Sequence, residues 1–367
     1  MRQSPIDYGR APAADEFEII IFGPGYGEAI AVHLGAARWI LVDSCVAAGA
    51  SAPVSADYLK HIGVPAECVQ AVVASHWHDD HVRGMSQLAA MFPAAKFYFP
   101  AVFADNEARA FLSAYSGEAC SGLSRGTGEL YRSLMSREMS IAVKSRVEII
   151  ENRALEPAVR VVAFSPTDAA FFQFLARIFE YVPRVNQSLP IGHAPAISPN
   201  LSSIVLHVDL GSDALLLGAD LERHEAGWDA VVADAWCRGK VQAGLIKLAH
   251  HGSASGDHPD MWGNLAVEKP LALLSPFNNG RHRLPTSTDV TRILTRASKA
   301  FITSRSSNKA QIPADQLKRL QDMCTNIAPV NAGFGAVRVR RRVNADEWRV
   351  ETFGSAEELR TPSRRAA

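Results

Sequence analysis

The feature that most constrains this chain is a strand of the buried type that runs directly into a cluster of metal-binding side chains. QAVVAS (70–75) is compact and apolar, and the residues that follow it are HWHDDH. A loop at the end of a strand can direct alternate side chains to one point. His76 and His78 could therefore bind one ion, while Asp80 and His81 could turn toward a second. Imidazole together with carboxylate suits Zn²⁺, Mn²⁺ or Fe better than Ca²⁺ or Mg²⁺ alone.

The second half of the chain offers further ligand types at strand ends. LLLGAD ends an apolar stretch with Asp220, and IKLAHHGS ends another with His250 and His251. A two-metal site needs a carboxylate between its ions and a ligand for the second ion. Each of these residues, taken alone, could equally cap a strand end, and the first cluster could be a histidine-rich surface loop. Together they favour ligand roles, because unpaired histidines in such a loop have no use in packing.

Short apolar strands with interspersed helices occur in both halves of the chain. Two sheets packed together with helices outside would bury such strands on both faces, which predicts an α/β (α+β) sandwich. We expect a single domain over residues 17–354, with a mostly helical insertion at about 103–145. The polar ends, residues 1–16 and 355–367, are expected to be a flexible leader and a flexible tail.

Composition narrows the class of substrate. Lys and Arg together number 38, as do Asp and Glu, so the formal net charge is zero. Proteins that coat long nucleic acids usually carry a basic excess. We therefore expect a nucleotide substrate to be short, or to be met by a local patch.

Cysteine usage and hydropathy indicate the compartment. The five cysteines include no C-x-x-C pair and fit no disulfide or zinc-finger framework, which favours a reducing compartment. No apolar stretch resembles a signal peptide or approaches the ~20 residues of a membrane helix. We expect a soluble cytoplasmic protein without a membrane partner.

The order of these motifs resembles the metallo-β-lactamase superfamily. H-x-H-x-D-H is followed by G-x-D after a strand, and then by a histidine at a strand end. Within that superfamily the chain is similar to the hydrolase domain of the bacterial competence DNA-uptake channel and its free-standing relatives. The segments that carry this likeness are FGPGYGEAIAVHLGAARWILVDS (22–44), NLSSIVLHVDLGSDALLLGADLE (200–222), IKLAHHGS (246–253) and NNGRHRLPTSTDVTRIL (278–294).

The resemblance covers residues 17 to about 305, and the insertion matches poorly. It implies an αββα fold, two mixed sheets flanked by helices, with the site at one sheet edge. It also implies two divalent ions, Zn or Mn, with ligands distributed over both halves of the chain. His76 and His78 would bind the first ion, Asp80, His81 and His250 the second, and Asp220 both. Asp43 would support the site by hydrogen bonding to the ligand loop.

Two positions depart from the superfamily pattern. Many members supply a further histidine to the first ion, and Asn200 stands near that place here. His193 could take over this role, or it could be an ordinary loop histidine. Cys45 replaces the usual glycine after Asp43, and we interpret it as a buried, inert thiol.

These residues predict a metal-dependent hydrolase that uses a dinuclear site and a metal-bound hydroxide. Two ions would lower the pKa of bound water toward ~7, and Asp80 could orient the hydroxide. The competence-type likeness implies phosphodiesterase or nuclease activity on nucleic acid or a small nucleotide. Further catalytic candidates are His251, as proton donor to the leaving oxygen, and His282. Substrate-binding candidates are Asn200, Asn279, Arg281 and Arg283, although the two arginines could be only a solvated turn.

Two other functions stay open at this stage. The same site could hydrolyse an ester, a lactone or a β-lactam, because fold alone does not determine the substrate. The chain could also be a non-catalytic regulatory module that binds metal. The sequence does not indicate an oligomeric state.

Overall fold

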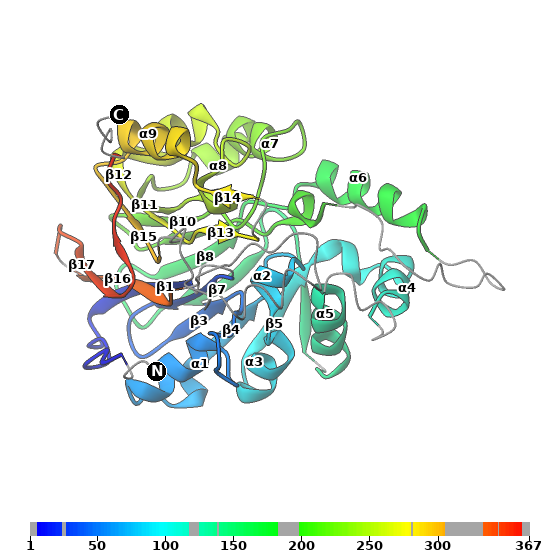
Figure 1. The fold of residues 1–367 in the computed structure, drawn as a ribbon, viewed down its shortest axis with the longest axis horizontal. Helices are drawn as coiled ribbons and strands as arrows, with labels where there is room; N and C mark the ends of the chain where they lie inside the picture. The colour runs from blue at the N-terminus through cyan, green and yellow to red at the C-terminus, as the bar shows by residue number, and fades with distance from the viewer. Residues whose placement is uncertain are drawn as a thin grey trace, which may run out of the picture.

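Two large β-sheets stacked face to face form the centre of the molecule, and helices cover their outer faces (Figure 1). The computed structural model describes residues 6–23, 27–116, 125–137, 139–182, 198–279, 282–304, 333–343 and 345–361. Both sheets are mixed and each has eight strands. This is the αββα arrangement predicted from the sequence, and that prediction is confirmed.

The first sheet comes from the N-terminal part of the chain and from one hairpin near its C-terminus. Its strands lie in the order β17-β16-β1-β2-β3-β4-β5-β6, antiparallel from β17 to β3 and parallel from β3 to β6. Their bounds are β1 Glu16–Gly23, β2 Ala29–His33, β3 Trp39–Val42, β4 Val69–Val73, β5 Lys96–Pro100, β6 Ser140–Val143, β16 Gly335–Arg342 and β17 Arg349–Gly354.

The second sheet has the order β18-β15-β12-β11-β10-β9-β8-β7. It is antiparallel from β7 to β10 and parallel from β10 to β15. Its bounds are β7 Glu148–Asn152, β8 Val159–Ala163, β9 Leu206–Asp209, β10 Ala214–Leu217, β11 Ala243–Lys247, β12 Ala266–Leu274, β15 Lys299–Ile302 and β18 Glu357–Glu358. A small hairpin, β13 Phe277–Asn278 with β14 Arg283–Leu284, stands beside it.

Alternation of side chains along each strand assigns residues to three apolar layers. In β1, Ile19 and Ile21 pack between the sheets, while Ile20 and Phe22 face the helices below. Because successive side chains point to opposite faces, a strand covered on both sides must be apolar throughout. This explains why the central strands read as continuous hydrophobic runs.

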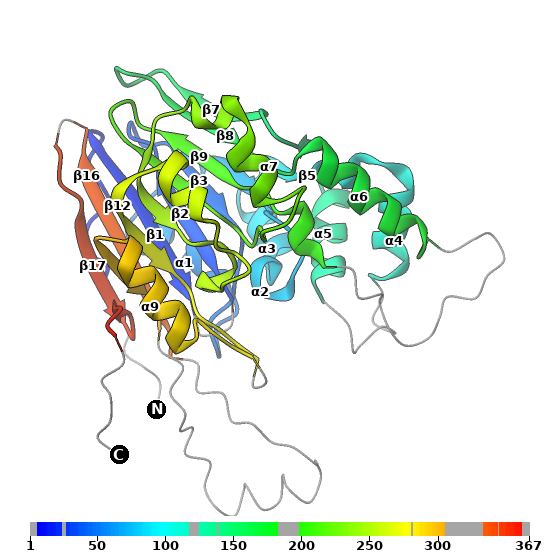
Figure 2. The ribbon, with the colours of Figure 1, turned by 90° about the horizontal axis from the view of Figure 1, so that it is seen from above.

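Helices complete the outer layers. In Figure 1, α1 and α3 lie under the first sheet, and α7, α8 and α9 lie over the second. Figure 2 shows α4, α5 and α6 beyond β5, at one end of the sandwich. The bounds are α1 Val54–His61, α2 Asp79–Val82, α3 Met85–Met91, α4 Asn106–Ala114, α5 Arg125–Met135, α6 Asp168–Phe179, α7 Trp228–Ala233, α8 Ala235–Arg238 and α9 Ser287–Arg296. None of the helices in the described ranges is long and apolar enough to cross a membrane.

Described residues near both ends of the chain pack against the sandwich. Tyr8 is buried against Phe22 and Tyr58, with ring centroids 6.5 and 4.9 Å away. At the other end, β18 pairs with β15, and Leu359 is buried. Each of the two polar end segments therefore makes a packed contact with the sandwich in its described part. One apolar anchor in each polar segment is enough to hold it, and no periodicity in the sequence marks so short a contact.

The predicted insertion at 103–145 is helical in its described part, but it is built into the sandwich. Its last residues form β6, which extends the first sheet parallel to β5.

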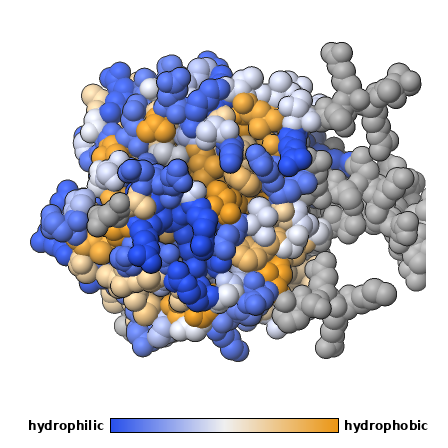
Figure 3. Space-filling view, turned by 90° about the vertical axis from the view of Figure 1, so that its left-hand side faces the viewer, coloured by the Kyte–Doolittle hydropathy of each residue, from blue (hydrophilic) through white to orange (hydrophobic). Residues whose placement is uncertain are grey.

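The edge of the first sheet on the side opposite to this helical end is formed by β17. Figure 3 looks at the left-hand side of Figure 1, where hydrophilic side chains gather. β17 lies at this edge and carries Arg349 and Glu351, which form an ion pair of 3.5 Å. Charged side chains along an edge strand disfavour pairing with another chain.

Candidate metal centre

The candidate ligands gather at one edge of the sandwich, where parallel strands end. His76, His78, Asp80 and His81 follow β4, while Asp220 and His251 follow β10 and β11. Because the carboxyl ends of parallel strands meet at the same edge, residues far apart in sequence come together here. The two sheets thus contribute to one cluster, which we call the metal cluster: His76, His78, Asp80, His81, Asp220 and His251.

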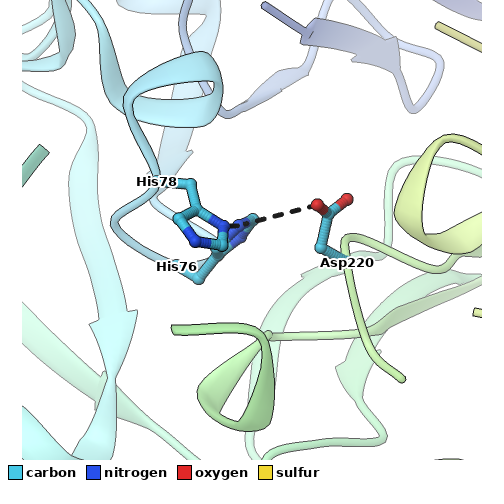
Figure 4. A group of neighbouring side chains, drawn as sticks. All are labelled: His76, His78 and Asp220. Atoms are coloured by element: carbon cyan, nitrogen blue, oxygen red, sulfur yellow. Dashed lines mark hydrogen bonds and ion pairs between the residues drawn. The ribbon is translucent and has the colours of Figure 1, made fainter. Parts of the chain in front are cut away.

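His76, His78 and Asp220 form the first potential ion site. Their ligand atoms lie within 4.8 Å of one another. His76 Nε2 lies 3.1 Å from His78 Nδ1 and 3.9 Å from Asp220 Oδ2 (Figure 4). Burial and the charge of His81 lower the pKa of His76 well below its usual value. A neutral imidazole is the form that binds a metal ion.

Asp80, His81 and His251 form the second potential site, again within 4.8 Å. His251 Nε2 is 3.1 Å from Asp80 Oδ2, and His81 Nε2 is 3.3 Å from Asp220 Oδ1. Asp220 therefore stands between the two groups: Oδ1 faces His81, and Oδ2 lies 3.9 Å from His76 Nε2 and 3.6 Å from His251 Nε2. Burial acts to raise the pKa of Asp220, but His81 and His251 outweigh it and hold that pKa well below its usual value.

Unpaired buried atoms test whether this cluster fits metal ions. Within the described residues, His81 Nε2 and Asp220 Oδ1 are buried and 3.3 Å apart, yet neither makes a well-directed hydrogen bond. Buried polar atoms are normally satisfied, and an ion between these two atoms would complete both. A set of four imidazoles and two carboxylates is suited to divalent transition metals. The residues present therefore fit a two-ion site.

The two neighbouring histidines after β11 exchange the places that the sequence analysis assigned to them. His251 joins Asp80 and His81, whereas His250 lies outside both groups. His250 Nδ1 instead contacts Ser255 Oγ at 2.8 Å and Glu222 Oε1 at 3.2 Å. The geometry therefore groups His251, and not His250, with Asp80 and His81, while the ligand and proton-donor roles stay predictions. Both histidines have a left-handed backbone conformation, with φ of 47° and 54°. The spacing of residues in the sequence does not show which of the two rings such a turn directs inward.

Asp43 holds the ligand loop from beneath. Its carboxylate accepts hydrogen bonds of 2.7 Å from Ser75 N, Ser75 Oγ and His81 Nδ1. Because Ser75 Oγ donates to Asp43, it accepts from His76 Nδ1 at 3.0 Å. These bonds place protons on the Nδ1 atoms of His76 and His81. The Nε2 atoms of both rings are therefore directed at the cluster.

The helical segment also touches the ligand loop. Gly126 at the start of α5 donates its N–H to Asp79 Oδ1 at 2.5 Å, and a Cβ at Gly126 would overlap Trp77 O. This close approach requires glycine. Sequence reasoning did not single out Gly126.

A cavity of about 790 Å³ opens over the cluster. Asp79, Asp80, Asp220, His250 and His251 form its floor, and the β13–β14 hairpin forms one wall. The predicted residues Asn279, His282 and Arg283 line this wall, together with Phe277 and Leu284. The structure thus brings these three substrate-site candidates to the metal cluster.

Four other residues that the sequence singled out do not line this cavity in the described part of the chain. Asn200 is buried and does not line the cavity, and its side chain lies beside Glu222. Its Oδ1 has no hydrogen-bond partner among the described residues. His193 and Arg281 lie outside the described residues. Cys45 is fully buried, and burial raises the pKa of its thiol strongly, in agreement with an inert role.

The sequence analysis missed a buried polar group under the cluster, formed by Glu28, Lys247 and Ser275. All three side chains are fully buried. A signal was present, since Glu28 and Lys247 are charges inside otherwise apolar stretches, GEAIAV and GLIKLA. Charged residues are almost never fully buried unless they are paired.

Comparison with known proteins agrees with this architecture. The family model of the metallo-β-lactamase superfamily matches residues 22–116, a range that includes the ligand loop but ends before Asp220 and His251. No curated protein sequence matches the chain. Over residues 22–116 the chain is similar to that superfamily.

Some solved structures with low sequence identity are similar to part of this chain. One is the metallo-β-lactamase SMB-1 bound to 2-mercaptoethanesulfonate, with 15% identity, coverage of 64% of this chain and 80% of that one, and a TM-score of 0.34. Another is a HARLDQ motif mutant of a metallo-β-lactamase from Cronobacter sakazakii, with 17% identity, coverage of 66% and 79%, and a TM-score of 0.35.

Proposed function

We propose that this protein is a metal-dependent phosphodiesterase that acts on short nucleic acids or small nucleotides. His76 and His78 would hold one divalent ion, Zn or Mn, and Asp80, His81 and His251 a second, with Asp220 between them. Ions bound there would activate a water molecule and take up negative charge from the substrate's oxygens. The chain's own residues supply the remaining tasks.

The charge of the site is the observation that supports an anionic substrate. Four buried carboxylates, Glu28, Asp43, Asp80 and Asp220, face one buried ammonium, Lys247. Two divalent cations would exceed the remaining three negative charges by one. The cavity wall adds the guanidinium of Arg283 and the imidazole of His282. A phosphodiester carries one negative charge and would gain from this excess.

His250 has a separate role in this proposal. Its ring lines the cavity, and Glu222 and Ser255 hold it through Nδ1. A ring fixed in this way can present its other nitrogen to a phosphate or leaving-group oxygen. Asn279 Oδ1 accepts a hydrogen bond of 2.8 Å from His282 N, so it shapes the turn that carries His282 and Arg283.

The test compares substrates under one metal condition. We expect kcat/KM to be higher on bis-p-nitrophenyl phosphate, single-stranded DNA or a cyclic dinucleotide than on a chromogenic β-lactam, with Mn²⁺ or Zn²⁺. Arg283→Ala should lower diester cleavage about tenfold, the scale of one hydrogen bond to a charged group. Arg342→Ala removes an arginine that is exposed and pairs with Asp15, so it should change neither rate. A preference for the β-lactam would contradict the phosphodiesterase proposal.

A further inference from the structure

Glu28 and Lys247 form an ion pair that joins the two halves of the chain directly under the metal cluster. Lys247 Nζ lies 2.5 Å from Glu28 Oε1, and neither side chain is exposed. Glu28 precedes β2 in the first sheet, whereas Lys247 ends β11 in the second. Removing two charges from water costs several kcal/mol per ion, so the effect of this pair depends on the further bonds that its two residues make.

The pair contacts the backbone of the ligand segments. Lys247 Nζ donates to Ala219 O at 3.0 Å, immediately before Asp220. Glu28 N donates to Asp80 O at 2.7 Å. One ion pair is thus tied to the backbone at both carboxylate ligands.

Ser275 links this pair to His251. Its hydroxyl donates to Glu28 Oε2, so its oxygen can only accept from His251 Nδ1, which lies 3.2 Å away. The His251 proton is then on Nδ1 and the Nε2 lone pair is free. That lone pair lies 3.1 Å from Asp80 Oδ2, and two acceptors directed at one point are what a shared cation requires.

A second chain of hydrogen bonds has the same kinds of group. Asp43 accepts from Ser75, and Ser75 accepts from His76 Nδ1. In both chains a carboxylate next to a strand of the first sheet orients a serine at the end of a parallel strand, and the serine orients an imidazole of the metal cluster. The chain of hydrogen bonds from Asp43, which we call the Asp43 relay, reaches His76 of the first ion site, and Asp43 also accepts directly from His81 of the second. The chain from Glu28, which we call the Glu28 relay, reaches His251 of the second site.

The two relay carboxylates are close to each other, which explains the lysine. Oxygens of Glu28 and Asp43 lie within 4.8 Å, together with a nitrogen of His81. Two like charges at this distance repel strongly inside a protein. Lys247 lies beside Glu28 and within the field of Asp43 and Asp220, so it compensates both relays at once.

We propose that Glu28, Ser275 and Lys247 are positioning residues for the second metal ion: Glu28 orients Ser275, Ser275 orients His251, and Lys247 keeps the two relay carboxylates together. This inference rests on the proposed metal site. It predicts that the second ion, not the first, depends on Glu28.

The experiment is a titration of metal-depleted protein with Co²⁺. Calorimetry measures the affinity for each ion, and visible absorption reports the coordination of the bound ion. Wild-type protein should bind two ions. Glu28→Gln keeps the shape of the side chain but removes its charge, and should weaken the second ion about 10- to 100-fold, the usual effect of losing a partner of a metal ligand. Ser275→Ala should act in the same direction, with an altered absorption band for the second ion.

Glu18→Gln is the matched control. Glu18 is also fully buried and paired, with Arg340 at 2.5 Å, but on the β1–β16 side of the sheet. Its loss should lower stability and leave both Co²⁺ affinities unchanged. Because Glu28 and Ser275 act through one chain of contacts, the double variant should bind the second ion no more weakly than Glu28→Gln alone.

The outcomes separate the two proposals. If wild-type protein binds no Co²⁺, both the metal site and this relay are wrong. If wild-type protein binds two ions and Ser275→Ala binds each of them as tightly as wild type does, the relay alone is wrong. Ser275→Ala leaves the ion pair intact, so it also decides the question if Glu28→Gln does not fold. Additive losses in the double variant would equally overturn the relay.

Discussion

Two buried groups of charges in this molecule are built in opposite ways. The first, which we call the Glu18 cluster, consists of Glu18, Tyr58, Arg338 and Arg340. Glu18 accepts from Tyr58 Oη at 2.6 Å and from Arg340 Nε at 2.5 Å, while Arg338 pairs with Glu351. The metal cluster instead combines an excess of carboxylates with orphan atoms on His81 and Asp220.

This difference separates a structural group from a functional one. In the Glu18 cluster the carboxylate has its cation and its donors, so folding alone completes it. In the metal cluster the protein's cations do not match its carboxylates. An uncompensated buried charge is costly, so such a group is retained only where something else completes it. The comparison therefore predicts opposite responses to the same kind of substitution.

The largest expected effect is on turnover. Asp80→Ala and His251→Ala should each reduce kcat at least about 10³-fold, because either change removes a ligand of one ion and leaves water unactivated. Elemental analysis should show the loss of one ion per chain, with an unchanged circular dichroism spectrum. His250→Ala should retain both ions, since His250 lies outside both groups. If His250→Ala loses an ion while His251→Ala keeps both, the exchange of the two histidines is wrong.

The next effect is on the stability of the metal-depleted protein. Glu18→Gln should lower the free energy of unfolding by about 3 kcal/mol, because it leaves the Arg340 guanidinium buried without its partner. Asp220→Asn removes one of several crowded negative charges and should cost less than about 1 kcal/mol, or even stabilise. Urea unfolding of both variants with chelator present measures the two values. Equal losses would remove the distinction between the clusters.

The smallest expected effect is a pH dependence of the free energy of unfolding, caused by His33 beside the Glu18 cluster. Burial, together with the charge of Arg340, lowers the pKa of His33 to about 4, against the bond from its Nδ1 to Glu16 O. Because the pKa of His33 is lower in the folded protein than its unfolded value of about 6.5, its contribution to the stability of the folded state is complete above about pH 6.5. This contribution falls as the pH drops toward about 4. Between pH 7.5 and 5.5 the loss should be about 1.4 kcal/mol. His33→Gln should remove this part of the pH dependence, and an unchanged profile in that variant would show that His33 is not its source.

Much of the fold and one half of the site could be predicted from the sequence. Continuous apolar strands require cover on both faces, which leads to a sandwich of two sheets with helices outside. The run of HWHDDH after β4 places His76, His78, Asp80 and His81 on one short loop. Contacts within such a loop depend on residues that are neighbours in sequence, so the grouping of these four residues can be predicted from the sequence.

The sequence by itself therefore determined the layers and the short loop that carries four residues of the metal cluster. Only the tertiary structure decided which of His250 and His251 turns inward, because two left-handed residues after β11 set that direction. It alone paired Glu28 with Lys247, whose strands belong to different sheets. The anchoring of Tyr8 and Leu359 was likewise a tertiary matter. In each case the deciding contact is made with a segment distant in sequence, and no local pattern in the chain encodes such a contact.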